Sequence, residues 1–136
     1  MVNLFPGIRK LLETLKKEGY KIGIVTSRTR ESAMRYLHMF AIASYFDDLV
    51  TCEDTRAHKP DPEPLLLGLK KLDARPEESL MVGDSPFDIR CANQAGVKSV
   101  LVDWRITEDE NPRVGEAAAD FQIKEPIELL SILEKA

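Results

Sequence analysis

The sequence predicts an α/β fold: a Rossmann-like parallel sheet with helices on both faces. Short apolar runs alternate along the chain with segments in which apolar residues recur every three or four positions. The runs are too apolar for strands with one face in water, which favours a parallel sheet covered on both sides. Connections between parallel strands are right-handed, and this restricts the topology to Rossmann-like arrangements. The length of 136 residues predicts one domain, residues 1–136.

Each element is predicted from its spacing and its boundaries. Thr29 is suited to cap a helix, and Gly19 and Gly96 stand where two helices should stop. The strands are short, apolar and rich in β-branched residues. In chain order the expected elements are helix Pro6–Glu18, strand Lys21–Thr26, helix Thr29–Met39, strand Asp48–Cys52, a helix opened by Asp61-Pro62 with Leu65, Leu66, Leu69 and Leu72 on one face, strand Ser79–Gly83, helix Pro86–Ala95, strand Lys98–Val102, short strand Phe121–Ile123 and helix Pro126–Glu134.

Composition excludes several classes of function. The net charge is −4 and the basic residues form no block, so binding to nucleic acid or to a membrane surface has no electrostatic support. No apolar run is long enough to span a bilayer, and the first residues do not resemble a signal peptide. Cys52 and Cys91 lack metal-type spacing and are interpreted as buried thiols in a reducing compartment. We therefore expect a cytoplasmic protein.

The segment Val82–Asp88 is the strongest chemical signal. It places Asp84 at the tip of a predicted strand and Asp88 four residues later, in the first turn of a helix. Two carboxylates at this spacing suit a Mg²⁺ ion that keeps several of its waters. The structural alternative is that Asp84 turns the chain and Asp88 offsets the helix dipole.

Two further groups are predicted near the carboxyl ends of the strands, where ligands bind in such sheets. Lys59 lies in a loop stiffened by two prolines and is suited to neutralise a phosphoryl group, although a solvated lysine explains it as well. Thr26 and Ser27 end a strand, and a hydroxyl there can hold a phosphate oxygen or merely cap a helix. His58 is interpreted as packed or solvated.

The order of these motifs resembles the haloacid dehalogenase superfamily. A strand ending in Thr-Ser, the loop HKPDPEP and a strand ending GDSPFDI are similar to its second, third and fourth motifs, in the style of phosphoglycolate phosphatases and pyrophosphatases. The resemblance implies Mg²⁺-dependent hydrolysis of a small phosphorylated metabolite through an aspartyl-phosphate. It further implies that Thr26 and Ser27 hold phosphate, that Lys59 bridges phosphate and nucleophile, and that Asp84 and Asp88 serve the metal.

The resemblance fails at the first motif of the family, an apolar strand ending in Asp-x-Asp. No Asp-x-Asp occurs in the 136 residues, and the cap that reads the substrate is not found either. Asp103 follows an apolar strand, but Arg105 stands where the second carboxylate belongs. Asp103 is therefore a weak candidate for the nucleophile.

The missing strand is central in the family, between the strands that end at Thr26 and Asp84. Its loss leaves three outcomes: these two strands close together, another chain fills the gap, for example by self-association, or the sequence is part of a longer protein. Three hypotheses of function follow: a phosphatase completed elsewhere, a non-catalytic remnant that binds phosphate or a partner, and a dehalogenase proper. The third is disfavoured because those enzymes need no metal.

Overall fold

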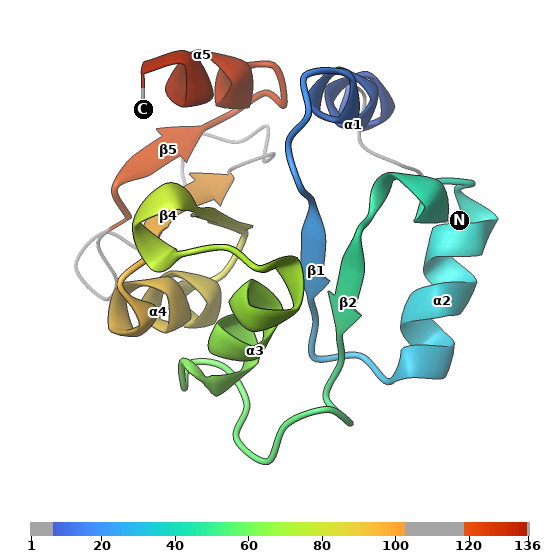
Figure 1. The fold of residues 1–136 in the computed structure, drawn as a ribbon, viewed down its shortest axis with the longest axis vertical. Helices are drawn as coiled ribbons and strands as arrows, with labels where there is room; N and C mark the ends of the chain where they lie inside the picture. Colours follow the sequence, from blue (N-terminus) through green and yellow to red (C-terminus); the bar gives the residue numbers. More distant parts are fainter. Residues whose placement is uncertain (1–6, 103–118, 136) are drawn as a thin grey trace, which may run out of the picture.

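The computed structural model describes residues 7–102 and 119–135, in which helices and strands alternate (Figure 1). The α/β alternation predicted from the sequence is confirmed. The elements are α1 (Ile8–Lys17), β1 (Gly23–Val25), α2 (Arg30–Met39), β2 (Asp48–Val50), α3 (Glu63–Leu72), β3 (Leu80–Gly83), α4 (Pro86–Ala95), β4 (Lys98–Val102), β5 (Phe121–Ile123) and α5 (Glu128–Lys135). Two short 3₁₀ turns, Ala43–Tyr45 and Pro76–Glu78, precede β2 and β3 and were not predicted.

The predicted helix boundaries agree with the caps in the structure. The side chain of Thr29 accepts a hydrogen bond of 3.2 Å from the backbone N–H of Ser32, so it caps α2 as expected. Gly96 ends α4 in the left-handed conformation, with φ of 76°, which a residue with a side chain adopts only under strain. Pro6 lies outside the described residues.

Some sequence-based expectations are wrong in detail. β1 and β2 are shorter than predicted and both end earlier, at Val25 and Val50; at the start of β1 the N–H of Ile22 donates to a carboxylate oxygen of Asp47 at 2.8 Å. Leu66 does not share the buried face of α3: it is 45% exposed, whereas Leu65 and Leu69 are buried. In a helix, adjacent residues point about 100° apart, so Leu65 and Leu66 cannot both face the centre of one buried stripe.

All pairings between described strands are parallel, but they form two separate sheets. β1 pairs with β2, and β3, β4 and β5 pair in that order. Within the described residues β1 and β3 each have a strand partner on one side only, and they are not paired with each other. The sequence left three outcomes open for the missing central strand. Direct pairing of β1 with β3 was one of them, and the structure does not have it. Figure 1 shows β1 and β2 side by side, apart from the sheet of β4 and β5.

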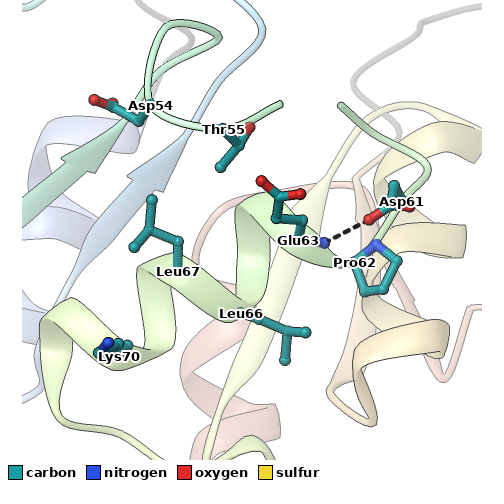
Figure 2. Close-up of a pocket in the computed structure, with 8 residues that line it drawn as sticks. All are labelled: Asp54, Thr55, Asp61, Pro62, Glu63, Leu66, Leu67 and Lys70. Atoms are coloured by element: carbon teal, nitrogen blue, oxygen red, sulfur yellow. Dashed lines mark hydrogen bonds between the residues drawn. The ribbon is translucent and has the colours of Figure 1, made fainter. Parts of the chain in front are cut away.

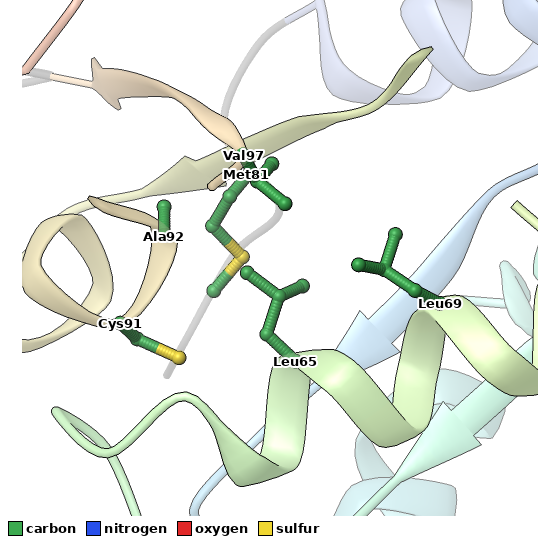
Figure 3. Packing of buried hydrophobic residues seen from close by; sticks show 6 residues of the cluster. All are labelled: Leu65, Leu69, Met81, Cys91, Ala92 and Val97. Atoms are coloured by element: carbon green, nitrogen blue, oxygen red, sulfur yellow. The ribbon is translucent and has the colours of Figure 1, made fainter. Parts of the chain in front are cut away.

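Helices cover both faces, as predicted, and apolar clusters hold the two sheets together. α3 and α4 pack on one face, where Leu65, Leu69, Met81, Cys91, Ala92 and Val97 form a buried cluster that also contacts Val25 of β1 (Figure 3). On the other face α1 contributes Leu15 to a cluster with β4, β5 and α5, and Leu12 to a cluster with α2. Thus α1 and α3 each contact residues of both sheets, and this contact fixes the sheets relative to each other.

No described helix is both long and apolar enough to cross a membrane.

Candidate functional site

Lys59 joins the two sheets at the carboxyl ends of their strands. Its ammonium nitrogen lies 2.6 Å from Oδ1 of Asp88 at the start of α4, and it donates to the carbonyl oxygen of Val25, the last residue of β1, at 3.2 Å. Both side chains of the ion pair are mostly buried, with 14% of Lys59 and 10% of Asp88 exposed. Burial strengthens the attraction because water screens it little.

The loop after β2 holds Lys59 in this place through its own polar contacts. A carboxylate oxygen of Asp54 accepts from the N–H of Thr51 at 2.7 Å and from its hydroxyl at 2.9 Å. These two hydrogen bonds hold the pKa of Asp54 below its usual range, and the bond from the Thr51 N–H has the larger effect. Asp61 accepts from the N–H of Glu63, the first residue of α3, at 2.9 Å, while the N-cap position itself is taken by Pro62. The peptide bond from Lys59 to Pro60 is cis.

Asp88 is held from the opposite side by the turn that opens α4. Its Oδ2 accepts from the hydroxyl of Ser85 at 3.2 Å and from the N–H of Asp84 at 3.3 Å, while its own N–H donates to the Ser85 hydroxyl. Ser85 is therefore the N-cap of α4. The pattern Ser-x-x-Asp before an apolar helix is a sequence signature of such a cap. The sequence analysis assigned no role to Ser85, although this pattern marks it as a cap.

Gly83 is required by the close approach of Asp88. A Cβ atom added at Gly83 would lie 2.3 Å from Cβ of Asp88 and 2.6 Å from its Oδ2. These separations are far inside van der Waals contact, and α4 would have to move to relieve them. The glycine of the Gly-Asp-Ser sequence therefore allows the first turn of α4 to pack directly on the end of β3.

Asp84 differs from Asp88 in that its side chain is exposed. Among the described residues it forms no ion pair, and its N–H, not its carboxylate, contacts Asp88. The sequence predicts that Lys59 lies near Asp84 and that both meet Asp88 at one edge of the sheet. In the structure the ion pair of Lys59 is with Asp88, which also accepts from the Asp84 N–H, while the Asp84 carboxylate is exposed at the tip of β3.

Thr26 and Ser27 lie on a small hollow together with Lys59. The hollow lies between the loops that follow β1 and β2; its lining residues are Thr26, Ser27, Thr51, Cys52, Thr55, His58, Lys59 and Pro64. The Thr26 hydroxyl accepts from the N–H of Arg28 at 3.1 Å, and Ser27 is exposed. Two of the predicted phosphate-binding residues and the predicted cation are thus brought to one hollow.

A larger hollow lies on the outer side of the same loop (Figure 2). Leu66 and Leu67 of α3 line it, and its charged side chains are Asp54, Asp61, Glu63 and Lys70. Three of these four charges are negative, so this hollow repels a phosphate group, whereas the charged residue of the smaller hollow is the cation Lys59.

The two cysteines have different surroundings. Cys91 is buried, and burial raises the pKa of its thiol, as expected for an inert core cysteine. Cys52 is half-buried and lines the small hollow, so the expectation that both thiols are buried is wrong for this residue. Its position two residues after the end of β2, at the edge of the sheet where ligands bind, could have indicated this.

The described residues fit a hard metal ion only in part. They contain no group of three or more His, Cys, Asp or Glu side chains arranged to hold a metal. Asp84 offers one open carboxylate, whereas both oxygens of Asp88 already accept hydrogen bonds. A Mg²⁺ ion bound through one carboxylate must keep most of its waters or gain oxygens from elsewhere.

Comparison with known proteins settles the family. Residues 1–102 match the sequence family of haloacid dehalogenase-like hydrolases. The chain belongs to this family. The resemblance drawn from the Thr-Ser, Lys-Pro and Gly-Asp-Ser motifs is therefore confirmed.

Proteins similar to this chain are phosphatases and pyrophosphatases by name. A protein of Caldanaerobacter subterraneus subsp. tengcongensis, provisionally named pyrophosphatase PpaX, is 44% identical over 127 residues, which are 93% of this chain and 57% of that protein. The crystal structure of a phosphatase of the family from Thermococcus onnurineus superposes with a TM-score of 0.83 at 32% identity, covering 96% of this chain and 58% of that one. A provisionally assigned phosphoglycolate phosphatase from Lactobacillus plantarum gives 0.84 at 30% identity, covering 96% and 60%.

The chain thus spans somewhat less than two thirds of the length of each of these relatives. The Asp103 side chain, our weak candidate for the nucleophile, lies outside the described residues.

Proposed function

We propose that this chain is the phosphate- and metal-binding part of a Mg²⁺-dependent phosphatase that acts on a small phosphorylated metabolite. The observation that carries the proposal is the position of Lys59, which lies between the end of β1 and Asp88 and on the same hollow as Thr26 and Ser27. A cation beside two hydroxyl side chains offers the donors that a phosphate oxygen accepts.

Each residue has a role in this proposal. The Thr26 and Ser27 hydroxyls hold phosphate oxygens, and the Lys59 ammonium neutralises the phosphoryl group as its charge is redistributed. Asp88 orients the lysine through the 2.6 Å contact, and through its bond with the Asp84 N–H it orders the turn that presents the Asp84 carboxylate. Asp88 therefore serves a metal indirectly, through that turn.

Asp84 is the residue that would hold Mg²⁺ by its carboxylate, completed by water and phosphate oxygens. When bound, the ion supplies further positive charge to the phosphoryl group, beyond that of Lys59.

In the complete protein we propose hydrolysis through an aspartyl-phosphate. The chemistry needs a carboxylate nucleophile on the phosphorus and a second carboxylate as general acid and base. No Asp-x-Asp occurs in the 136 residues, so we propose that these groups come from outside them. The relatives named pyrophosphatase and phosphoglycolate phosphatase favour a small phosphorylated substrate. The two free thiols favour a reducing compartment, which we propose to be the cytoplasm.

The alternative is a non-catalytic protein that binds phosphate or a partner chain. Two strand edges favour it. Within the described residues β1 and β3 each pair with a strand on one side only, and Val82 of β3 is 42% exposed. Unpaired strand edges bind added strands, so self-association at this position is part of the alternative.

The coding sequence upstream of Met1 distinguishes the two. An in-frame apolar segment that ends in Asp-x-Asp supports the phosphatase, and the protein extended by it should release phosphate in a Mg²⁺-dependent reaction that Lys59→Met abolishes. A stop codon directly upstream supports the non-catalytic protein, and a dimer that forms through β1 and β3 would add to that support. An extended protein whose phosphate release is unchanged by Lys59→Met would contradict the proposed role of the lysine.

A further inference from the structure

Gln94, near the end of α4, holds the loop residue that follows Lys59. Its side-chain amide donates to the carbonyl oxygen of Pro60 at 3.2 Å, 34 residues earlier in the chain. Lys59 itself reaches Asp88, in the first turn of the same helix, at 2.6 Å. Two adjacent loop residues are therefore attached to α4, one through its side chain and the other through its main chain.

The two points of attachment lie far apart along the helix. Asp88 and Gln94 are six residues apart in α4, which corresponds to about 9 Å of axial rise. The main chain at Pro60 is thus held beside the last turn of α4, whereas the ammonium of Lys59 lies beside the first turn. Because the lysine side chain spans these two levels, the position of the main chain decides where the ammonium can reach.

The turn that carries Lys59 is closed by a hydrogen bond of its own. The N–H of Asp61 donates to the carbonyl oxygen of His58 at 2.9 Å, but this bond does not attach the turn to a helix. In the described part of the chain, the polar attachment of the turn to α4 is made by the Lys59 ion pair and by the Gln94 amide. When the ion pair opens, the amide is the contact that keeps the turn beside α4.

A lysine side chain is a flexible four-carbon stem, so its ammonium needs support at both ends. Asp88 and the carbonyl oxygen of Val25 hold the ammonium end. We propose that Gln94 is a positioning residue, whose hydrogen bond to Pro60 holds the main-chain end and so keeps Lys59 at Asp88. The effect on the position of the lysine follows from these contacts alone, whereas an effect on phosphoryl transfer rests on the proposed function.

Acetylation of lysines by a short pulse of acetic anhydride, measured by mass spectrometry, tests the inference on the 136-residue chain. The Lys59 side chain is 14% exposed, so it should react slowly in comparison with the exposed Lys98 and Lys124. Gln94→Met keeps the side-chain length but removes the donor. It should raise the acetylation rate of Lys59 about fivefold, the change that one ordinary hydrogen bond makes in an opening equilibrium. Gln94→Arg, which restores N–H donors and is not itself acetylated, should return the rate towards that of the original chain.

Hydrogen exchange of the Asp61 N–H gives a second measure of loop opening, and it should accelerate in Gln94→Met by a similar factor. Gln122→Met is the matched control, because Gln122 is an exposed glutamine of β5 and its loss should leave Lys59 acetylation unchanged. Since Gln94 is exposed as well, the melting temperature should fall by at most about 4 °C in either variant.

Three outcomes would overturn the inference. They are an unchanged acetylation rate of Lys59 in Gln94→Met, an equal rise in Gln122→Met, and a rise that Gln94→Arg does not reverse.

The phosphatase extended by the upstream Asp-x-Asp segment separates this inference from the proposed function. In that protein Gln94→Met should lower kcat at least about threefold, because a small displacement of a positioned cation slows the reaction, and Gln94→Arg should restore it. A Gln94→Met protein with faster acetylation of Lys59 but unchanged kcat would support the positioning by Gln94 and count against the proposed role of the lysine.

Discussion

The ammonium of Lys59 lies 2.6 Å from Oδ1 of Asp88, 29 residues further along the chain. This contact joins the loop after β2 to the first turn of α4, and the second bond of the lysine, to the carbonyl of Val25, adds the end of β1. One side chain thus connects parts of the chain that belong to both sheets. The candidate site and the cohesion of the fold therefore depend on the same ion pair.

Removing one partner of this pair should destabilise the protein strongly. Lys59→Met leaves the Asp88 carboxylate buried without a counter-charge, and breaking a buried pair in this way costs about 3–5 kcal/mol of unfolding free energy. Urea unfolding measures the loss. Asp88→Asn in the Lys59→Met background should recover much of it, because no uncompensated charge then remains. The control is Lys71→Met: Lys71 lies 3.7 Å from Asp48 and both side chains are 30% exposed, so its loss should be below about 1 kcal/mol. Equal losses for the two lysines would contradict the buried character of the pair.

Gly83→Ala should be more damaging than the same change at another strand glycine. The new methyl group meets the Cβ of Asp88 at 2.3 Å, and overpacking of this kind typically costs about 1–3 kcal/mol. Gly23→Ala is the control, because its nearest neighbour is the end of the flexible Leu72 side chain at 3.0 Å. Denaturant unfolding of both variants measures the difference. A stability of Gly83→Ala equal to that of Gly23→Ala would mean that α4 does not pack on β3 as described.

Asp47 should make stability depend on pH in the acid range. Two hydrogen bonds lower the pKa of its carboxyl below the ordinary value of 3.8. The bond from the Lys16 side chain has the larger effect, and the bond from the N–H of Ile22 adds to it. A lowered folded-state pKa means that the stabilisation is present above about pH 4 and is lost as the pH falls through the folded pKa. Asp47→Asn should therefore melt at a lower temperature than the original chain at pH 7, and the difference should shrink towards pH 3.

Thermal unfolding between pH 3 and pH 7 checks this prediction for Asp47. Glu31→Gln is the control, since the ion pair of Glu31 with Arg35 is almost fully solvated and should matter little at any pH. A difference between Asp47→Asn and the original chain that is the same at pH 3 and pH 7 would show that the ionised carboxylate is not the source of the stabilisation.

The 136-residue chain by itself should hydrolyse no phosphate ester above background. It contains no Asp-x-Asp segment, and a lysine with a metal ion gives only electrostatic stabilisation without a covalent intermediate. The measurement is turnover of para-nitrophenyl phosphate with and without Mg²⁺. Robust Mg²⁺-dependent turnover that Asp103→Asn abolishes would make Asp103 the nucleophile and overturn this prediction.

Mg²⁺ should bind weakly to the chain alone. One open carboxylate, Asp84, is a poor set of ligands for an ion that demands octahedral oxygen coordination. At millimolar Mg²⁺ the stabilisation should be only a few tenths of a kcal/mol, as for a ligand near its dissociation constant. Thermal unfolding with and without the ion measures it, and calorimetry gives the affinity. Micromolar affinity that Asp84→Asn abolishes would show that further carboxylates complete the site.

The sequence by itself determined the order and type of the elements, because these depend on local chemistry. Residue spacing predicted the bounds of α4, β4 and β5 as the structure has them. Thr29 and Gly96 marked helix ends correctly, because capping depends on one residue and its neighbours. The motif order identified the family, and the carboxyl ends of the strands were the correct region for the Thr26, Lys59 and Asp84 side chains.

Tertiary structure decided which of those side chains meet. Local spacing does not reveal that Lys59 pairs with Asp88 and not with Asp84, because the choice depends on how α3 and α4 pack on β1 and β3. It also decided that β1 and β3 stay apart, since hydrogen bonds between strands are made by backbone groups that every sequence carries.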